Sequence, residues 1–166
     1  STEDTDMNEL ITAMVGRSLE NRFPEVDNTP GDVVLSVQHL STKFEPYLKD
    51  VSFDVRKGEI FGLYGLVGAG RTELMETIFG VRTRAAGRVY FNNHLMNFES
   101  AKDAMEHGFA MITEERKANG LFLKGDLTFN TTIANLKQYK SGIALSDSKM
   151  EKATAEEIKT MRTKCM

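Results

Sequence analysis

The sequence predicts an α/β fold built around a glycine-rich loop between a buried strand and a helix. Residues 60–64 (IFGLY) are a continuous apolar run, which is typical of a strand covered on both faces. Residues 65–70 contain three glycines, and residues 72–79 carry apolar side chains at helical spacing. Upstream, residues 51–56 alternate apolar and polar, which indicates a half-buried strand.

Length and composition bound the possible functions. The chain has 166 residues, of which 40% are hydrophobic and 27% charged, so one folded domain with its own core is expected. Its 21 basic and 24 acidic residues give a net charge of −3, which argues against a nucleic-acid partner. Cys165 is the single cysteine, which excludes a disulfide framework or a cysteine-based zinc site.

The longest mostly apolar run, residues 60–69, is far shorter than the about 20 residues of a membrane-crossing helix. Any association with a membrane is therefore expected to depend on a protein partner.

The N-terminal residues are predicted to form an appendage. Residues 6–22 show helical apolar spacing, with Asp6 as N-cap and Glu9 completing a capping box. Residues 24–32 include two prolines and a glycine, which are typical of a linker. Compact structure is therefore expected from residue 33 onward.

The later elements are assigned from the same patterns. Ser148 is expected to cap the last helix, with Glu151 as its capping-box partner. In chain order the expected elements are a strand at 33–40, a strand at 87–91, a helix at 100–107, a strand at 109–113, a loop at 114–128, and helices at 129–139 and 148–164.

The glycine loop carries the candidate chemistry. Residues 65–72 (GLVGAGRT) follow the order glycine, four residues, glycine, cation, threonine, and they join a predicted strand to a helix as a phosphate-binding loop does. Glycines let backbone N–H groups turn toward a phosphate chain, and the helix N-terminus adds positive charge. The candidate nucleotide-binding residues here are Gly65, Leu66, Val67, Gly68, Ala69, Gly70, Arg71 and Thr72.

Two residues of this loop have distinct expected roles. The Thr72 hydroxyl is a candidate Mg²⁺ ligand. Arg71 stands where the pattern has lysine, and its guanidinium is bulkier and forked rather than a compact charge. Triphosphate binding is expected to survive this change, whereas catalytic geometry is in question.

Rival interpretations of the loop are weaker. A dinucleotide fold would place a third glycine at Glu73 and an acidic residue at the end of the next strand, where the chain reads Phe91-Asn92-Asn93. A GTPase would show an Asn-Lys-x-Asp segment, which the sequence lacks. A glycine-rich turn that binds no ligand remains the alternative.

Three segments together resemble the ATP-binding subunits of bacterial ABC importers for simple sugars. The likeness is to the galactose/methyl-galactoside type, with the ribose type next, and it covers about residues 7–164. Residues 14–24 (MVGRSLENRFP) are similar to the junction after the first of two fused cassettes. Residues 50–60 (DVSFDVRKGEI) resemble the strand pair before the phosphate loop, and residues 108–121 (GFAMITEERKANGL) resemble the region around the second Q-loop.

The resemblance implies a P-loop ABC ATPase cassette core with an antiparallel β subdomain, truncated before the signature motif and the Walker B segment. Residues 1–23 would be the helical tail of the preceding cassette, 24–32 the linker, and 33–166 the N-terminal part of the second cassette. Residues 114–166 contain no LSGGQ-type signature, Walker B aspartate, catalytic glutamate or switch histidine. No catalytic residue is therefore expected in this fragment, and no hydrolysis by it alone.

The resemblance also implies ATP and Mg²⁺ as ligands and two further site residues. Phe44, 27 residues before Arg71, lies where ABC cassettes place an aromatic that stacks on adenine; a loop aromatic at the sheet edge is the alternative. Tyr47 is the second aromatic of that loop. Glu114 stands where a glutamine usually reaches Mg²⁺, and a solvated loop acid is the alternative.

The implied function is energy coupling in sugar uptake. The parent protein would bind MgATP between two cassettes, hydrolyse it and drive transport. Its partners would be transmembrane permease subunits, a second ATPase cassette and, through the permease, a periplasmic or lipoprotein sugar-binding protein. It would be peripheral, at the cytoplasmic face of the cell membrane. Arg71 favours an alternative, a degenerate module that holds ATP as the structural half of a cassette pair; a free-standing nucleotide sensor is a third hypothesis.

Overall fold

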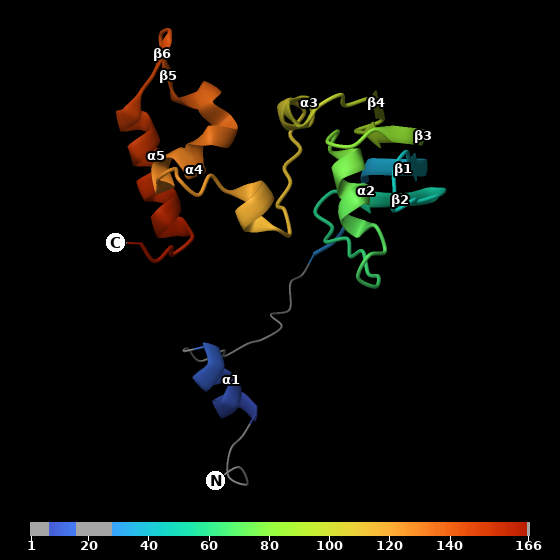
Figure 1. Ribbon diagram of the computed structural model, residues 1–166, viewed down its shortest axis with the longest axis horizontal. Coiled ribbons are helices and arrows are strands. Elements are labelled where there is room, and N and C mark those ends of the chain that lie inside the picture. Colours follow the sequence, from blue (N-terminus) through green and yellow to red (C-terminus); the bar gives the residue numbers. More distant parts are fainter. Residues whose placement is uncertain (1–6, 16–27, 166) are drawn as a thin grey trace. The chain divides into compact units, whose positions relative to one another are not determined.

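The computed structural model describes residues 7–15 and 28–165 (Figure 1). The described chain divides into two compact units: the first holds residues up to Leu74 and Thr83–Asn97, and the second holds Met75–Arg82 and the residues from Phe98 onward. Helix α1 (Met7–Val15) confirms the first part of the helix expected at 6–22. The expected cap Asp6 and residues 24–27 of the expected linker lie outside the described residues, whereas residues 28–32 are described and form neither helix nor strand.

The first unit contains a four-stranded antiparallel sheet in the order β2-β1-β3-β4 (Figure 1). Its strands are β1 (Val33–Thr42), β2 (Val51–Arg56), β3 (Arg84–Phe91) and β4 (His94–Met96). Val37 of β1 pairs with Phe53 of β2 and with Val89 of β3. Val37, Leu40 and Val89 are buried and form the centre of this unit. The expected antiparallel β structure is confirmed.

Strand β1 is interrupted at His39, whose φ is 51°. The pairing register with both neighbours shifts there, between Val37 and Leu40 on one side and between Gln38 and Ser41 on the other. Gly87 of β3 faces the break with φ +92°, and a Cβ on it would lie 2.5 Å from the His39 carbonyl oxygen and from the Leu40 Cα. Only glycine fits this approach of two backbones.

Residues Asn92 and Asn93 connect β3 to β4, which the sequence analysis did not predict. Both have positive φ, 48° and 64°, a backbone conformation that asparagine adopts more readily than most residues. This is the signature of a tight two-residue hairpin. The signal was present in the sequence as Asn-Asn directly after the apolar residues 89–91.

The run at 60–64 is not a strand, which corrects the sequence prediction. It pairs with no strand in the described part of the chain. Its side chains still alternate: Ile60 is 90% and Tyr64 99% exposed, while Phe61 stacks on Phe53 with ring centroids 5.0 Å apart. The backbone is therefore extended with one half-covered face, but a strand also needs neighbouring backbone groups to bond.

The run at 109–113 departs from the prediction in the same way. It forms no strand, and Ile112 is 95% exposed. Phe109 packs edge-on against Phe98, with ring centroids 5.1 Å apart. The face that carries Phe109 is again partly covered, but no strand among residues 28–165 pairs with this run.

Helix α2 (Arg71–Ile78) begins in the first unit and continues into the second. The other helices of the second unit are α3 (Ala101–Glu106), α4 (Leu127–Thr132) and α5 (Asp147–Thr160), with a π-helical turn at Arg116–Gly120 and a 3-10 helix at Ile133–Tyr139. Helix α4 packs against α5. The caps of α3 and α4 are Ser100 and Asp126, whose side chains accept from the backbone of Asp103 and Phe129.

Two details of the C-terminal helices differ from the predictions. The helix expected at 129–139 is instead the end of α4 followed by the 3-10 helix. The 3-10 helix is itself kinked at Asn135, whose φ and ψ of −139° and 45° are not helical. The N-cap of α5 is Ser146 rather than Ser148, since the Ser146 side chain accepts from the Lys149 N–H. A short hairpin of β5 (Lys140–Ser141) and β6 (Ala144–Leu145) precedes it and was not predicted.

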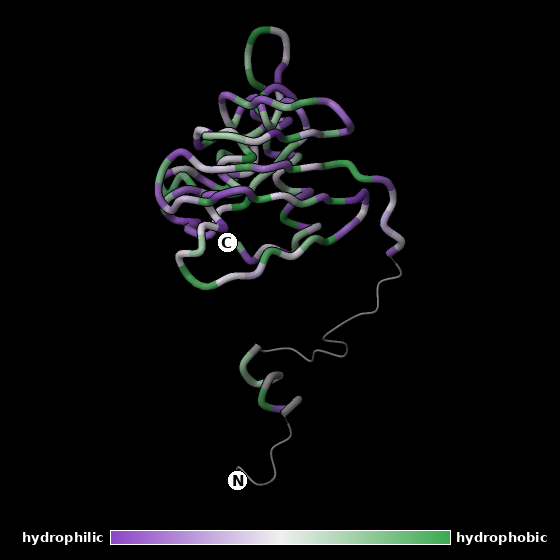
Figure 2. The backbone as a smooth tube through the Cα atoms, turned by 90° about the vertical axis from the view of Figure 1, so that its right-hand side faces the viewer, coloured by the Kyte–Doolittle hydropathy of each residue, from purple (hydrophilic) through white to green (hydrophobic). Residues whose placement is uncertain are grey.

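Hydrophobic residues are distributed in short stretches along the chain. Figure 2 shows green and purple segments alternating through the tube. Among the helices that the structure describes, none combines the length and the apolar character that crossing a membrane would need.

Candidate functional site

The glycine loop folds as a compact turn at the start of α2. The Ala69 N–H donates to the Leu66 carbonyl at 3.0 Å, and the Leu74 N–H donates to the Gly70 carbonyl at 2.9 Å. Gly68 and Gly70 have φ of 81° and 82°. Two left-handed residues two positions apart turn the backbone sharply, as a loop that wraps an anion requires.

Both ends of the loop are closely packed. A Cβ on Gly65 would lie 3.2 Å from the Ala69 Cβ and 3.7 Å from the Arg71 Cδ. The stem of Arg71 therefore runs back past the first glycine. A Cβ on Gly70 would lie 2.8 Å from the Leu48 Cδ2, so Leu48 fills the space beside the last glycine.

Arg71 and Thr72 occupy the first turn of α2 and are exposed. The first N–H groups of a helix have no partner within it, and they carry the positive end of the helix dipole. A guanidinium and a hydroxyl added to these groups make a surface that favours an anion. Gly65, Leu66, Val67, Gly68, Ala69 and Gly70 precede them in the same unit, so the structure brings the eight predicted loop residues together.

The aromatic candidates lie in the segment that joins β1 to β2. Phe44 and Tyr47 are 58% and 60% exposed, and the Lys43 Nζ lies 5.6 Å from the centroid of the Phe44 ring. The Phe44 ring is thus more than half exposed, and its stacking on adenine stays a prediction. The next residue after Tyr47 is Leu48, which touches Gly70, so the aromatic segment and the glycine loop are neighbours in the first unit.

Glu114 belongs to the second unit and is exposed. Its carbonyl accepts from the Arg116 N–H at 3.1 Å, in a tight turn before the π-helical turn at Arg116–Gly120. Glu114 therefore follows an extended run rather than a strand end. Thr72 lies in the other unit, and a shared Mg²⁺ site for these two residues stays a prediction.

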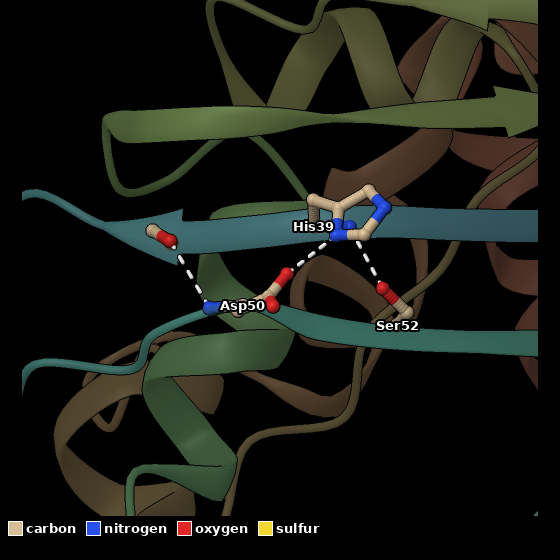
Figure 3. Close-up of polar contacts among 4 residues, drawn as sticks. His39, Asp50 and Ser52 are labelled. Atoms are coloured by element: carbon tan, nitrogen blue, oxygen red, sulfur yellow. Dashed lines mark hydrogen bonds and ion pairs between the residues drawn. The ribbon is translucent and has the colours of Figure 1, made fainter.

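The histidines make local contacts. The His39 Nδ1 lies 2.5 Å from the Asp50 Oδ1, and the His39 N–H donates to the Ser52 Oγ at 2.8 Å (Figure 3). The Nδ1 of His94 and of His107 contact the carbonyl oxygens of residues 92 and 103. In the described part of the chain, no group of three or more His, Cys, Asp or Glu side chains is arranged to hold a metal ion.

Sequence reasoning missed two residues that shape this region. Thr42 is buried and hydrogen-bonds both Pro46 and Leu48, and Leu48 packs on Gly70. A threonine two residues after the predicted strand at 33–40 and four residues before a proline was the available signal, because such hydroxyls often close turns. The contact of Leu48 with Gly70 joins residues 22 positions apart and had no local signal.

Comparisons with known proteins found relatives that match nearly the whole chain. The chain is similar to galactose/methyl galactoside import ATP-binding proteins MglA: it is 56% identical to that of Treponema denticola over 98% of this chain and 33% of the relative. It is 52% identical to that of Treponema pallidum over 100% and 34%, and 45% identical to that of Escherichia coli K12 over 95% and 31%. The chain thus spans about one third of the length of these curated relatives.

A solved structure shares the fold. It is cbiO1 from Clostridium perfringens, described as part of the ABC transporter complex cbiONQ, with a TM-score of 0.52 and 20% identity over 80% of this chain and 52% of that chain. The family model described as ABC transporter matches residues 48–164, which include the glycine loop, α2 and the segment around Glu114. On that match, the chain belongs to the ABC transporter family.

Proposed function

We propose that this chain is the nucleotide-binding part of an ATP-binding subunit that couples ATP to the import of a simple sugar of the galactose/methyl-galactoside type. The observation that carries the proposal is the glycine loop, with Arg71 and Thr72 on the first turn of α2 and Leu48 packed against Gly70. The import ATP-binding proteins to which the chain is similar support the sugar class.

In this proposal the chain's own residues bind and orient the nucleotide. Backbone N–H groups of residues 65–72 and the Arg71 guanidinium would hold the phosphates, and Phe44 would stack on the adenine ring. The proposed Mg²⁺ ligands are the Thr72 hydroxyl and the Glu114 carboxylate, both exposed oxygen donors of the hard type that Mg²⁺ prefers. Bound Mg²⁺ would supply charge neutralisation along the phosphate chain.

We place this activity within a longer protein. Residues 1–23 would be the helical tail of a preceding cassette, residues 24–32 a linker, and residues 33–166 the N-terminal part of a second cassette. The partners would be a second ATPase cassette and permease subunits, with a periplasmic or lipoprotein sugar-binding protein reached through the permease. The working location would be the cytoplasmic face of the cell membrane, with ATP hydrolysed by the full-length parent.

Arg71 supports a second candidate, a cassette half that holds ATP without turning it over. A forked guanidinium bonds phosphate oxygens in pairs, whereas lysine offers a compact charge that moves with the transferring group. The two candidates make opposite predictions for Arg71→Lys in a full-length parent. A rise in steady-state phosphate release favours the holding module, and unchanged or reduced release favours a working ATPase.

The test of nucleotide binding is a calorimetric titration of a non-hydrolysable ATP analogue, with and without Mg²⁺, into the wild-type chain and into Arg71→Ala. Loss of a charge-assisted hydrogen bond costs about 1.5–3 kcal/mol, so the substitution should weaken binding about ten- to a hundredfold. Lys117→Ala is a matched control, because Lys117 is an exposed cation of the second unit. Equal affinities of wild type and Arg71→Ala would identify the loop as a plain structural turn.

A further inference from the structure

The aromatic segment, residues 43–47, is closed by three hydrogen bonds of Thr42, two of which its side chain makes. The Thr42 N–H donates to the Leu48 carbonyl at 3.0 Å, and the Leu48 N–H donates to the Thr42 Oγ1 at 2.9 Å. The same Oγ1 donates to the Pro46 carbonyl at 3.1 Å. Thr42 is 6% exposed, so its hydroxyl acts as donor and acceptor away from bulk water.

The closed segment rests on the glycine loop through Leu48. A Cβ on Gly70 would lie 2.8 Å, 3.1 Å and 3.3 Å from the Leu48 Cδ2, Cγ and Cδ1. Leu48 therefore occupies the volume that a side chain at position 70 would take. The Thr42 hydroxyl makes two of the three hydrogen bonds that close the segment, and Leu48 sets the distance of the segment from the loop.

We propose that Thr42 is a positioning residue of the nucleotide site, which holds the aromatic segment and, through Leu48, sets its place beside the glycine loop. The inference rests on the proposed function, in which the segment meets the base and the loop meets the phosphates. A nucleotide that bridges both then binds a preformed pair of surfaces. Without the Thr42 hydroxyl, one backbone hydrogen bond is left to hold the segment, so more of its ordering takes place at the moment of binding, which weakens affinity.

This role makes a prediction that a purely structural role does not. A hydroxyl that only stabilised the fold would affect all ligands of the site alike. A hydroxyl that positions the aromatic segment affects ligands with a base and spares ligands that consist of phosphate alone. The ratio of the two affinities is therefore the informative readout.

The experiment measures calorimetric affinities for a non-hydrolysable ATP analogue and for inorganic tripolyphosphate. Thr42→Val keeps the side-chain shape and removes both hydroxyl hydrogen bonds, so we expect about tenfold weaker binding of the analogue and tripolyphosphate affinity within about twofold. Thr42→Ser retains the hydroxyl and should restore the analogue affinity. Leu48→Ala, which leaves Thr42 intact, should reproduce the selective loss.

Thr132→Val is the matched control. Thr132 is also buried, and its Oγ1 donates to the Thr128 carbonyl at 2.7 Å, but it lies in α4 of the second unit. We expect it to leave both affinities unchanged.

The outcomes separate the inference from the function on which it rests. If the wild-type chain binds neither ligand, the proposed function and the positioning role are both overturned. Wild-type chain that binds both ligands, with Thr42→Val and Leu48→Ala unchanged or equally weakened toward both, would overturn the positioning role alone. The positioning role would also be overturned if Thr42→Ser bound the analogue as weakly as Thr42→Val.

Discussion

Strand β1 and the run at 60–64 are both rich in apolar residues, yet their surroundings differ. Strand β1 lies between β2 and β3, and its Leu40 and Val37 are buried. The run at 60–64 has no neighbouring strand in the described chain, and its Phe61 stacks on Phe53. Hydrophobic side chains favour burial, but the backbone N–H and C=O groups of a strand also need partners. Partner strands, rather than apolar content, separate these two regions.

The largest expected effect is on the free energy of unfolding, from a matched pair of leucines. Leu40 is 0% and Leu66 82% exposed. Leu40→Ala leaves a cavity in the sheet and should cost about 2–5 kcal/mol. Leu66→Ala should stay within about 0.5 kcal/mol. Urea unfolding monitored by circular dichroism gives both values. Equal losses would mean that Leu66 has cover which the fold does not provide.

A matched pair of glycines gives the next effect. Gly87→Ala would force a Cβ against two backbones in the sheet. Together with the strain of the left-handed backbone conformation, this should lower the free energy of unfolding by about 2–4 kcal/mol. Gly68 has φ +81° and no atom within 4 Å of such a Cβ, so Gly68→Ala should cost only about 1–2 kcal/mol from backbone strain. Thermal unfolding of both variants makes the comparison. A larger loss for Gly68→Ala would show that the glycine loop is packed more tightly than the sheet.

The smallest effect concerns the pKa of Glu106, which forms an exposed ion pair between α3 and the 3-10 helix of the second unit. The Lys137 Nζ lies 2.5 Å from the Glu106 Oε1, and this hydrogen bond, with the lysine charge, holds the pKa of Glu106 below its ordinary value. Because the folded pKa is lowered, the contact stabilises the fold at neutral pH. The contribution is lost as the pH falls through the folded pKa.

Lys137→Gln should raise the pKa of Glu106 toward its ordinary value, as followed by NMR titration of the side-chain carboxyl. Lys102→Gln is the control, since Lys102 lowers the same pKa by charge alone and more weakly. An unchanged pKa in Lys137→Gln, or a greater rise in Lys102→Gln, would contradict the contact.

The sequence could predict the elements that depend on interactions between residues close together in the chain. Local alternation, helical spacing and turn chemistry predict strands β1 and β2, helix α2 and the glycine turn that contains Gly68 and Gly70. These predictions agree with the structure. The same apolar pattern predicts strands at 60–64 and 109–113, because a local pattern does not show whether a partner strand lies beside the run.

The site was predictable to the same extent. The loop at 65–72 is continuous in sequence, so its residues could be named from their spacing. The hydroxyl of Thr42 bonds residues only four and six positions away and so had a local signal. The contact between Leu48 and Gly70 depends on how the fold brings together residues 22 positions apart. No local pattern contains that information.

The central claim is that the glycine loop and the aromatic segment form one nucleotide site. The most direct measurement is a pair of NMR titrations that follow the backbone amides, one with a non-hydrolysable ATP analogue and one with inorganic tripolyphosphate. The account predicts that both ligands shift the amides of residues 65–72 and that only the analogue also shifts those of residues 43–48. Amides of residues 65–72 that stay unmoved by either ligand, or analogue shifts confined to other residues, would contradict it.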